Sequence, residues 1–192
     1  MTATAEVTDD LDLGEYNPAA VEKELETGGK LPPGKYHVRL ASTEDKAWRS
    51  GDRFHDLKFA ILAGPHAGQT HRESLNGFTP GTTDDKKKSA NNRYLLFASR
   101  LGLYDTAGGK YRLLKAKTPH EFSGCVGAEV IIEINHRSDK DDPTKKYAQI
   151  TFAGIYSLTD PKVKDVARAA PGDRPAAAAA TTQPAGYDTS DL

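Results

Sequence analysis

Apolar and polar residues alternate along several segments in the central part of the chain. In one of them Leu57, Phe59 and Ile61 fall on one side, while Phe54 and Lys58 fall on the other. A period of two is typical of a strand with one buried face. Applied to the whole chain, the pattern predicts five strands, over residues 35–40, 53–62, 69–75, 129–137 and 145–158.

Between the third and fourth predicted strands, the spacing of apolar residues changes to that of a helix. Residues 86–102 carry apolar side chains three or four positions apart, and Gly102 is a typical helix end. Residues 118–121, Thr-Pro-His-Glu, have the spacing of a capping box and predict a short helix that ends at Gly124. Residues 18–27 have the composition of a further short helix.

Three strands, a helix and a final pair of strands form an order that is typical of the OB-fold. This fold is a small, partly open five-stranded barrel that binds oligonucleotides on one face. The sequence therefore predicts a mainly β protein, a five-stranded OB-fold barrel with a helical insertion between strands 3 and 4, flanked by disordered tails. The predicted nucleic-acid-binding domain covers residues 31–159.

Both ends of the chain differ in composition from this domain. Residues 1–30 form an acidic N-terminal segment, and residues 160–192 form an Ala/Pro-rich tail that we expect to be disordered. The tail ends in an acidic and apolar tip. We expect the tip to recruit replication or recombination proteins through Tyr187, Asp188, Asp191 and Leu192.

The net charge of −1 conceals an uneven distribution along the chain. Residues 1–30 contain eight acidic and two basic residues, a net charge of −6, whereas residues 31–160 contain 20 basic and 15 acidic residues, a net charge of +5. A positive surplus on the predicted domain favours a polyanionic partner, although a surplus of this size is also common on ordinary protein surfaces.

The lone cysteine and the distribution of apolar residues exclude several classes of protein. Cys125 is the only cysteine, so an intramolecular disulfide and a cysteine-based zinc site are excluded, and its apolar neighbours predict a buried side chain. No segment approaches the roughly 18 apolar residues that a membrane helix needs, and the N-terminus lacks a signal peptide. We therefore expect a cytoplasmic protein without membrane contact, as a monomer or a homo-oligomer.

Glycines and apolar positions in five places follow the pattern of a known family: residues 31–40 (Leu-Pro-Pro-Gly-Lys-Tyr-His-Val-Arg-Leu), 57–64, Gly68, 91–96 and 122–134. Over about residues 31–158 the chain thereby resembles the phage-type single-stranded-DNA-binding proteins with an OB-fold. The resemblance implies sequence-independent binding of single-stranded DNA in replication, recombination or repair. For a phage-encoded chain it also implies a location in the cytoplasm of the host cell.

Binding a single strand without reading its sequence requires cations for the phosphates and flat side chains for the bases. The segment between the first two predicted strands supplies both kinds, because Trp48 and Arg49 are followed by Arg53 and Phe54. The last hairpin offers a further aromatic residue, Tyr147. The candidate DNA-binding residues are Trp48, Phe54 and Tyr147 as stacking platforms and Arg39, Lys46, Arg49, Arg53, Lys58, Arg72 and Lys145 as phosphate contacts.

Plain structural alternatives to these roles stay open at this point. They are a Trp48 ring that folds back onto the barrel, arginines 39 and 72 that are merely solvated, and a Lys145 whose charge is cancelled by nearby aspartates. Residues 86–88, Lys-Lys-Lys, follow two aspartates, and cations oppose the dipole at a helix N-terminus. We interpret this run as a solvated helix end that could extend a site, and not as the main site.

No catalytic signature competes with the binding interpretation. Residues 64–70 have three residues between their glycines and then Gln69, where a phosphate-binding loop needs four residues and a lysine. The six histidines are scattered, and the aspartates of residues 139–142 lie in one polar loop beside Lys140. We therefore expect no enzyme activity, no cofactor and no metal. The alternative is a protein-interaction or adaptor module on a small β-barrel without DNA binding.

Overall fold

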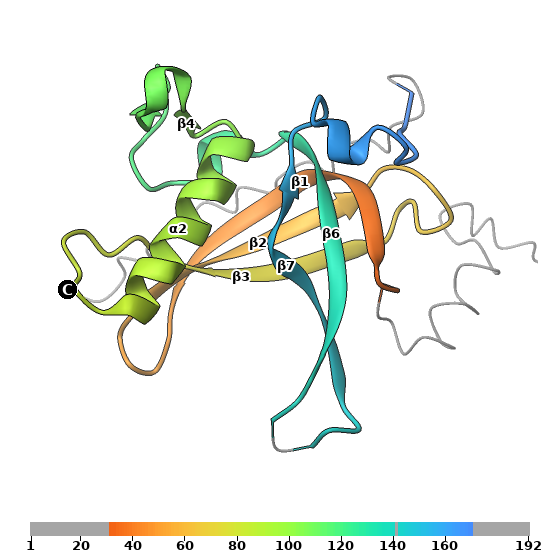
Figure 1. Cartoon of the computed structure of the whole chain (residues 1–192), viewed down its shortest axis with the longest axis horizontal. Coiled ribbons are helices and arrows are strands. Elements are labelled where there is room, and N and C mark those ends of the chain that lie inside the picture. The colour runs from red at the N-terminus through yellow and green to blue at the C-terminus, as the bar shows by residue number, and fades with distance from the viewer. Residues whose placement is uncertain (1–30, 141, 171–192) are drawn as a thin grey trace, which may run out of the picture. The chain divides into compact units, whose positions relative to one another are not determined.

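The structure, a computed structural model, describes residues 31–140 and 142–170 (Figure 1). Residues 1–30 are not among the described residues. The predictions made for that segment, including a helix over 18–27, lie outside the described residues. The same holds for the tip at 187–192.

Five long strands form one antiparallel sheet, in the spatial order β3-β2-β1-β6-β7. The prediction of a mainly β protein with five strands is therefore confirmed. In the described residues no backbone ladder joins the edge strands β3 and β7, so hydrogen bonding between strands does not close the sheet into a barrel. The strands are β1 (Gly34–Ala47), β2 (Arg53–Ile61), β3 (Thr70–Asn76), β6 (Glu129–Ser138) and β7 (Lys146–Tyr156).

The first strand is much longer than the predicted segment over residues 35–40. Its residues 34–39 pair with β6 and its residues 38–47 pair with β2, and the register with β2 shifts between Leu40 and Ser42. Such a bulge bends a strand and lets it serve two neighbours. Hydrophobic alternation did not predict the second half of β1, because both faces of the strand are polar there. Asp45 lies on the inner side, for example, and its Oδ1 is 2.5 Å from His55 Nδ1.

The helix α2 (Asp85–Arg100) covers the inner face of the sheet and agrees with the prediction over residues 86–102. It buries Tyr94, Phe97 and Ala98 against Leu57, Phe59 and other apolar side chains. Each fully buried large apolar side chain stabilises a fold by about 1.5–3 kcal/mol. No helix in the described part of the chain is long and apolar enough to cross a lipid bilayer. The buried position predicted for Cys125 is confirmed.

The short helix predicted over residues 118–124 is wrong. Glu121 N–H bonds back to Thr118 in a turn, and only a 3-10 turn, η2 (Ser123–Cys125), follows. His120 has a φ of +62°, which no helix permits, and its ring stacks on Phe78 at 5.2 Å. Packing of this ring therefore overrides the local capping signal.

Two further features were not predicted from the sequence. A small hairpin of β4 (Tyr104–Asp105) and β5 (Arg112–Leu113), with η1 (Ala107–Gly109) at its turn, follows α2. Packed structure also continues past residue 159, where the tail was predicted to begin. There η3 (Pro161–Val163) buries the Val163 side chain, and the Ala169 N–H donates to His37 Nδ1 at 3.2 Å.

A buried cluster of charged side chains joins the two edges of the sheet. Glu73 of β3 accepts a hydrogen bond from the Ile150 N–H of β7 at 2.9 Å. Arg93 of α2 donates to Glu73 Oε1 at 3.0 Å and to the Ile150 carbonyl at 3.0 Å. Side chains thus satisfy the two backbone groups of Ile150 that a neighbouring strand would otherwise pair. We call Glu73, Arg93 and Ile150 the edge clamp.

Breaking the edge clamp should destabilise the domain. Glu73→Gln and Arg93→Met each leave one buried partner uncompensated, which costs on the order of 3–5 kcal/mol. We expect a fall of about this size in the free energy of unfolding, measured by urea titration with far-UV circular dichroism. The control is Asp85→Asn, which removes an exposed partner of Lys88 and should change stability by less than about 1 kcal/mol. A Glu73→Gln variant as stable as the control would contradict the clamp.

The edge clamp should also make stability depend on pH. Burial alone would raise the pKa of Glu73, but His71, whose Nε2 lies 3.5 Å from Glu73 Oε2, the charge of Arg93 and the Ile150 N–H outweigh it and hold the pKa below the ordinary 4.5. Because the folded pKa is depressed, this stabilisation is complete above pH 4.5 and is lost as the pH falls through the folded value. Urea titrations from neutral pH downward should show a steeper acid decline for the wild type than for Glu73→Gln, and parallel curves would contradict this.

Candidate nucleic-acid interface

Four of the predicted site residues lie together on the outer sheet face, the face of β1, β2 and β3 that points away from α2. Residues directly opposite each other on paired strands project from the same side of a sheet. The register places Ser42, Lys58 and Arg72 in one cross-strand row. It places Lys46, Phe54 and Asn76 in a second row, nearer to the β1–β2 loop.

Trp48 provides the flat surface of this face. Its ring stacks on Phe54 with centroids 4.0 Å apart and planes inclined by 20°. Trp48 is 45% exposed, whereas Phe54 beneath it is 9% exposed. The prediction that Phe54 is itself a stacking platform therefore needs correction, because its ring is covered and supports that of Trp48. The Trp48 Nε1–H donates to Asn76 Oδ1 at 3.3 Å and fixes the tilt of the indole.

The cations around Trp48 are paired with acids to different degrees. Lys46 and Arg72 share Asp56, at 2.6 Å and 3.3 Å. The hydrogen bond to Asp56 and, to a smaller extent, the hydrogen bond to Glu44 raise the pKa of Lys46, so this side chain stays charged. Asp56 is itself only 13% exposed, so these two cations also compensate a largely buried carboxylate.

Three more of the predicted cations belong to β2 and the β1–β2 loop. Arg53 lies 3.6 Å from Asp45, and its side chain is largely exposed. In the part of the chain that the structure describes, no acidic side chain lies within ion-pair distance of Lys58 or Arg49. The loop and the outer sheet face therefore present cations in several directions around one aromatic ring.

The remaining predicted residues lie farther from Trp48. Arg39 is opposite Ala60 on β2, half-buried at the far end of the outer sheet face, and already makes a contact within the protein. Lys145 and Tyr147 belong to the β6–β7 hairpin, which projects separately from the β1–β2 hairpin (Figure 1). Lys145 pairs with Asp142 at 3.4 Å. Tyr147 is exposed, and its hydrogen bond to Asp139 raises its pKa.

A groove of about 480 Å³ opens beside Trp48, between the β1–β2 loop, the segment after β3 and the start of α2. The run of lysines at residues 86–88, interpreted from the sequence as a helix end that could extend a site, lies at this groove. Two of the three lysines line this groove, and the third, Lys88, pairs with Asp85. The lining residues used below are Trp48, Asp52, Asn76, Phe78, Lys86 and Lys87.

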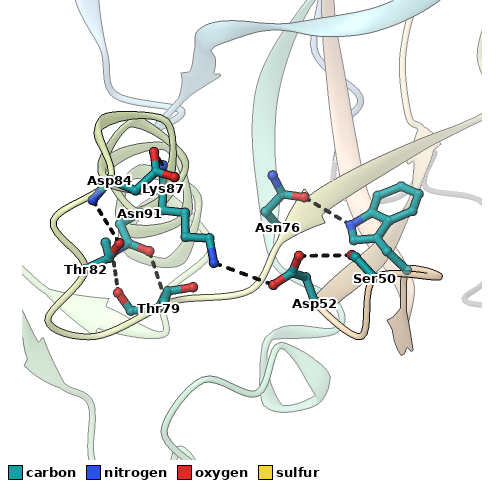
Figure 2. A network of polar contacts seen from close by, with 9 residues as sticks. Ser50, Asp52, Asn76, Thr79, Thr82, Asp84, Lys87 and Asn91 are labelled. Carbon is teal, nitrogen blue, oxygen red and sulfur yellow. Dashed lines mark hydrogen bonds and ion pairs between the residues drawn. The ribbon is translucent and has the colours of Figure 1, made fainter.

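Short polar contacts hold the walls of the groove (Figure 2). Asn91 of α2 accepts from the Thr79 N–H at 2.9 Å and donates to the Thr79 carbonyl at 2.8 Å. Gly77 continues the β2–β3 ladder so closely that a Cβ there would lie 3.0 Å from the Arg53 carbonyl oxygen. Asp84 caps α2 by accepting from two backbone amides of its first turn. The groove is therefore shaped before any ligand arrives.

The described residues offer little for covalent or metal chemistry. They contain no group of three His, Cys, Asp or Glu side chains that is arranged to hold a metal ion. Burial raises the pKa of the Cys125 thiol, which keeps this group protonated at neutral pH. The arrangement around Trp48 is suited to binding a flat, anionic ligand.

Comparison with known proteins gives a family for the chain. A family model described as "Protein of unknown function (DUF669)" matches residues 16–163. The matched range contains all five long strands and α2. No curated protein matches the chain.

The Trp48–Phe54 stack should be measurable as a coupling energy. Stacked aromatic pairs contribute about 0.5–1.5 kcal/mol beyond the area they bury. We expect a coupling of this size in a double-mutant cycle of Trp48→Ala and Phe54→Ala, from urea unfolding followed by far-UV circular dichroism. A cycle of Phe54→Ala with Tyr147→Ala, whose ring lies on the other hairpin, should be additive. Additivity in both cycles would show that Phe54 does not support Trp48.

Proposed function

The chain belongs to the DUF669 family, and we propose that it binds single-stranded DNA without sequence preference. The observation that carries this proposal is the Trp48 ring, half exposed on Phe54, beside a sheet face that carries cations from three strands. A single strand offers unpaired bases and a continuous row of phosphates, which this surface complements. As part of the same proposal, the protein acts in phage-type DNA replication, recombination or repair.

The sheet topology supports an OB-fold as part of this proposal. β1 is shared between β2 and β6, and the edge strands β3 and β7 are linked by the edge clamp in place of a ladder. A partly open barrel with this order of strands binds oligonucleotides on the face of its second and third strands and on two loops. Counted over the five long strands, these are β2, β3, the loop with Trp48 and Arg49, and the loop that ends at Lys145.

The energetics of such a surface suit sequence-independent binding. Stacking of a base on an aromatic side chain contributes roughly 1–3 kcal/mol and accepts any base, because every base has a π-face. Cations that contact phosphates add a sequence-independent term that weakens with salt. Trp48 supplies the first term, and Lys46, Lys58 and Arg72 supply the second.

A specific observation also favours the adaptor function as a second candidate. Tyr111, Leu113 and Leu114, on and beside β5, are exposed apolar side chains. Clusters of exposed apolar residues are typical of contacts with other proteins. This cluster lies on the β4–β5 hairpin and not on the outer sheet face, so a protein partner there is compatible with DNA on the other surface.

Titration with oligo-dT tests the proposed function. Binding should quench the fluorescence of Trp48, the only tryptophan, and should weaken with salt by a log–log slope of about −0.7 for each phosphate contact. Lys58→Ala and Arg72→Ala should each weaken binding and make the slope less negative by about 0.7. Lys164→Ala, an exposed position near η3, is the matched control and should bind like the wild type. Absence of both quenching and a gel shift would leave the adaptor function.

A further inference from the structure

We propose that the groove beside Trp48 is a slot for one nucleotide of the bound strand, and that Asp52 occupies its phosphate position when DNA is absent. This inference rests on the proposed function, because it names how a strand leaves the outer sheet face and enters the groove. It assigns a role to Asp52, Lys86 and Lys87, none of which lies on that face.

The groove has an aromatic part and a cationic part, which match the base and the phosphate of a nucleotide. Its volume of about 480 Å³ falls in the range of sites for small ligands, roughly 300–1,000 Å³. Trp48 and Phe78 supply aromatic surface for a base, and the two lysines of α2 supply charge for a phosphate. Asn76 adds a fixed donor. Because its Oδ1 accepts from Trp48 Nε1–H, its Nδ2 is left to donate to an oxygen or ring nitrogen of the ligand.

Asp52 faces this charge from the opposite wall. Its Oδ1 lies 3.8 Å from Lys87 Nζ, and the pair bridges the β1–β2 loop and α2 (Figure 2). Ser50 Oγ donates to Asp52 Oδ2 at 2.9 Å, and the Trp48 N–H donates to the Asp52 carbonyl at 2.9 Å. The loop that presents Trp48 therefore also sets the position of the carboxylate.

The ion pair between Asp52 and Lys87 is weak, so another anion can replace Asp52. The side chains of Lys87 and Asp52 are 47% and 60% exposed, and exposed ion pairs of this kind are weak. A phosphate of the bound strand is negatively charged, as Asp52 is, and can therefore pair with Lys87. Lys86 adds a second cation, and no acid pairs with it among the residues that the structure describes.

The lysine side chains, and not the helix N-terminus, provide the anion site. Asp84 already accepts from the Lys86 and Lys87 N–H groups, at 2.8 Å and 3.4 Å. The Asn91–Thr79 hydrogen bonds hold the facing wall in place. Exchange of Asp52 for a phosphate therefore requires the Asp52 and Lys87 side chains to separate, and no movement of α2.

Removal of the Asp52 charge tests the slot. In oligo-dT titrations of the full chain at low salt, Asp52→Asn should bind about 2–5-fold more tightly than the wild type, because an exposed pair no longer competes for Lys87. The salt slope should stay like that of the wild type, because Lys87 contacts a phosphate in both proteins. Lys87→Met in the Asp52→Asn background should remove the gain in affinity and make the slope less negative by about 0.7. Asp165→Asn removes the same charge at an exposed position beyond η3 and is the control.

The outcomes separate this inference from the proposed function. If the wild type binds and loses affinity in Arg72→Ala, but Asp52→Asn binds no more tightly than Asp165→Asn, the slot is wrong and the proposed function stands. An increase in affinity that persists when Lys87→Met is added also contradicts the exchange. If the wild type does not bind oligo-dT at all, the proposed function fails and the slot fails with it. Tighter binding that depends on Lys87 supports the slot.

Discussion

The edge clamp is the interaction on which the rest of this structure depends. A five-stranded sheet that does not close has two edges with unpaired backbone groups, and buried backbone groups without partners are costly. Here the Glu73 carboxylate accepts from the Ile150 N–H, and the Arg93 guanidinium donates to the Ile150 carbonyl. The same guanidinium lies over the ring of Phe97 at 5.0 Å. One ionic cluster therefore links β3, β7 and the helix that covers the core.

The position of the candidate site follows from this link. Arg93 fixes α2 against the two edges of the sheet, and the first turn of the same helix carries Lys86 and Lys87. β3 carries Glu73 toward the core and ends at Asn76, which orients Trp48. The separation between the indole and the lysines is thus set by elements that the clamp holds together. A groove between two elements keeps a defined width only when their packing is fixed, and here that packing is buried and charged.

The sequence predicted the sheet and the helix well, because both rest on periodicity. The strands around Leu57, Phe59 and Ile61 follow a period of two, and all three side chains are buried. Alternation through Leu75 also places Glu73 on its buried side, so the sequence contained a signal for a buried carboxylate that was not used. The groove had no such signal. Lys86 and Lys87 lie far along the chain from Trp48, and only the packing of α2 brings them together. The burial of Phe54 was missed for a related reason, since alternation gives the face of a side chain but not what covers it.

The ion pairs of this protein act in two different ways, depending on burial. Glu73 and Arg93 are shielded from water, so their separation is expensive and they hold the fold. Arg53 and Lys87 pair with exposed aspartates, where separation is cheap. Lys46 and Arg72 are cations that share the largely buried Asp56. These aspartates lower the net positive charge around Trp48 and hold the cationic side chains in place without adding much stability. On such a surface the aspartates keep the cationic side chains ordered while no ligand is bound. A polyanion that offers many phosphates at once can then displace the aspartates from these cations. Pairing of cations with aspartates around Trp48 is therefore compatible with DNA binding.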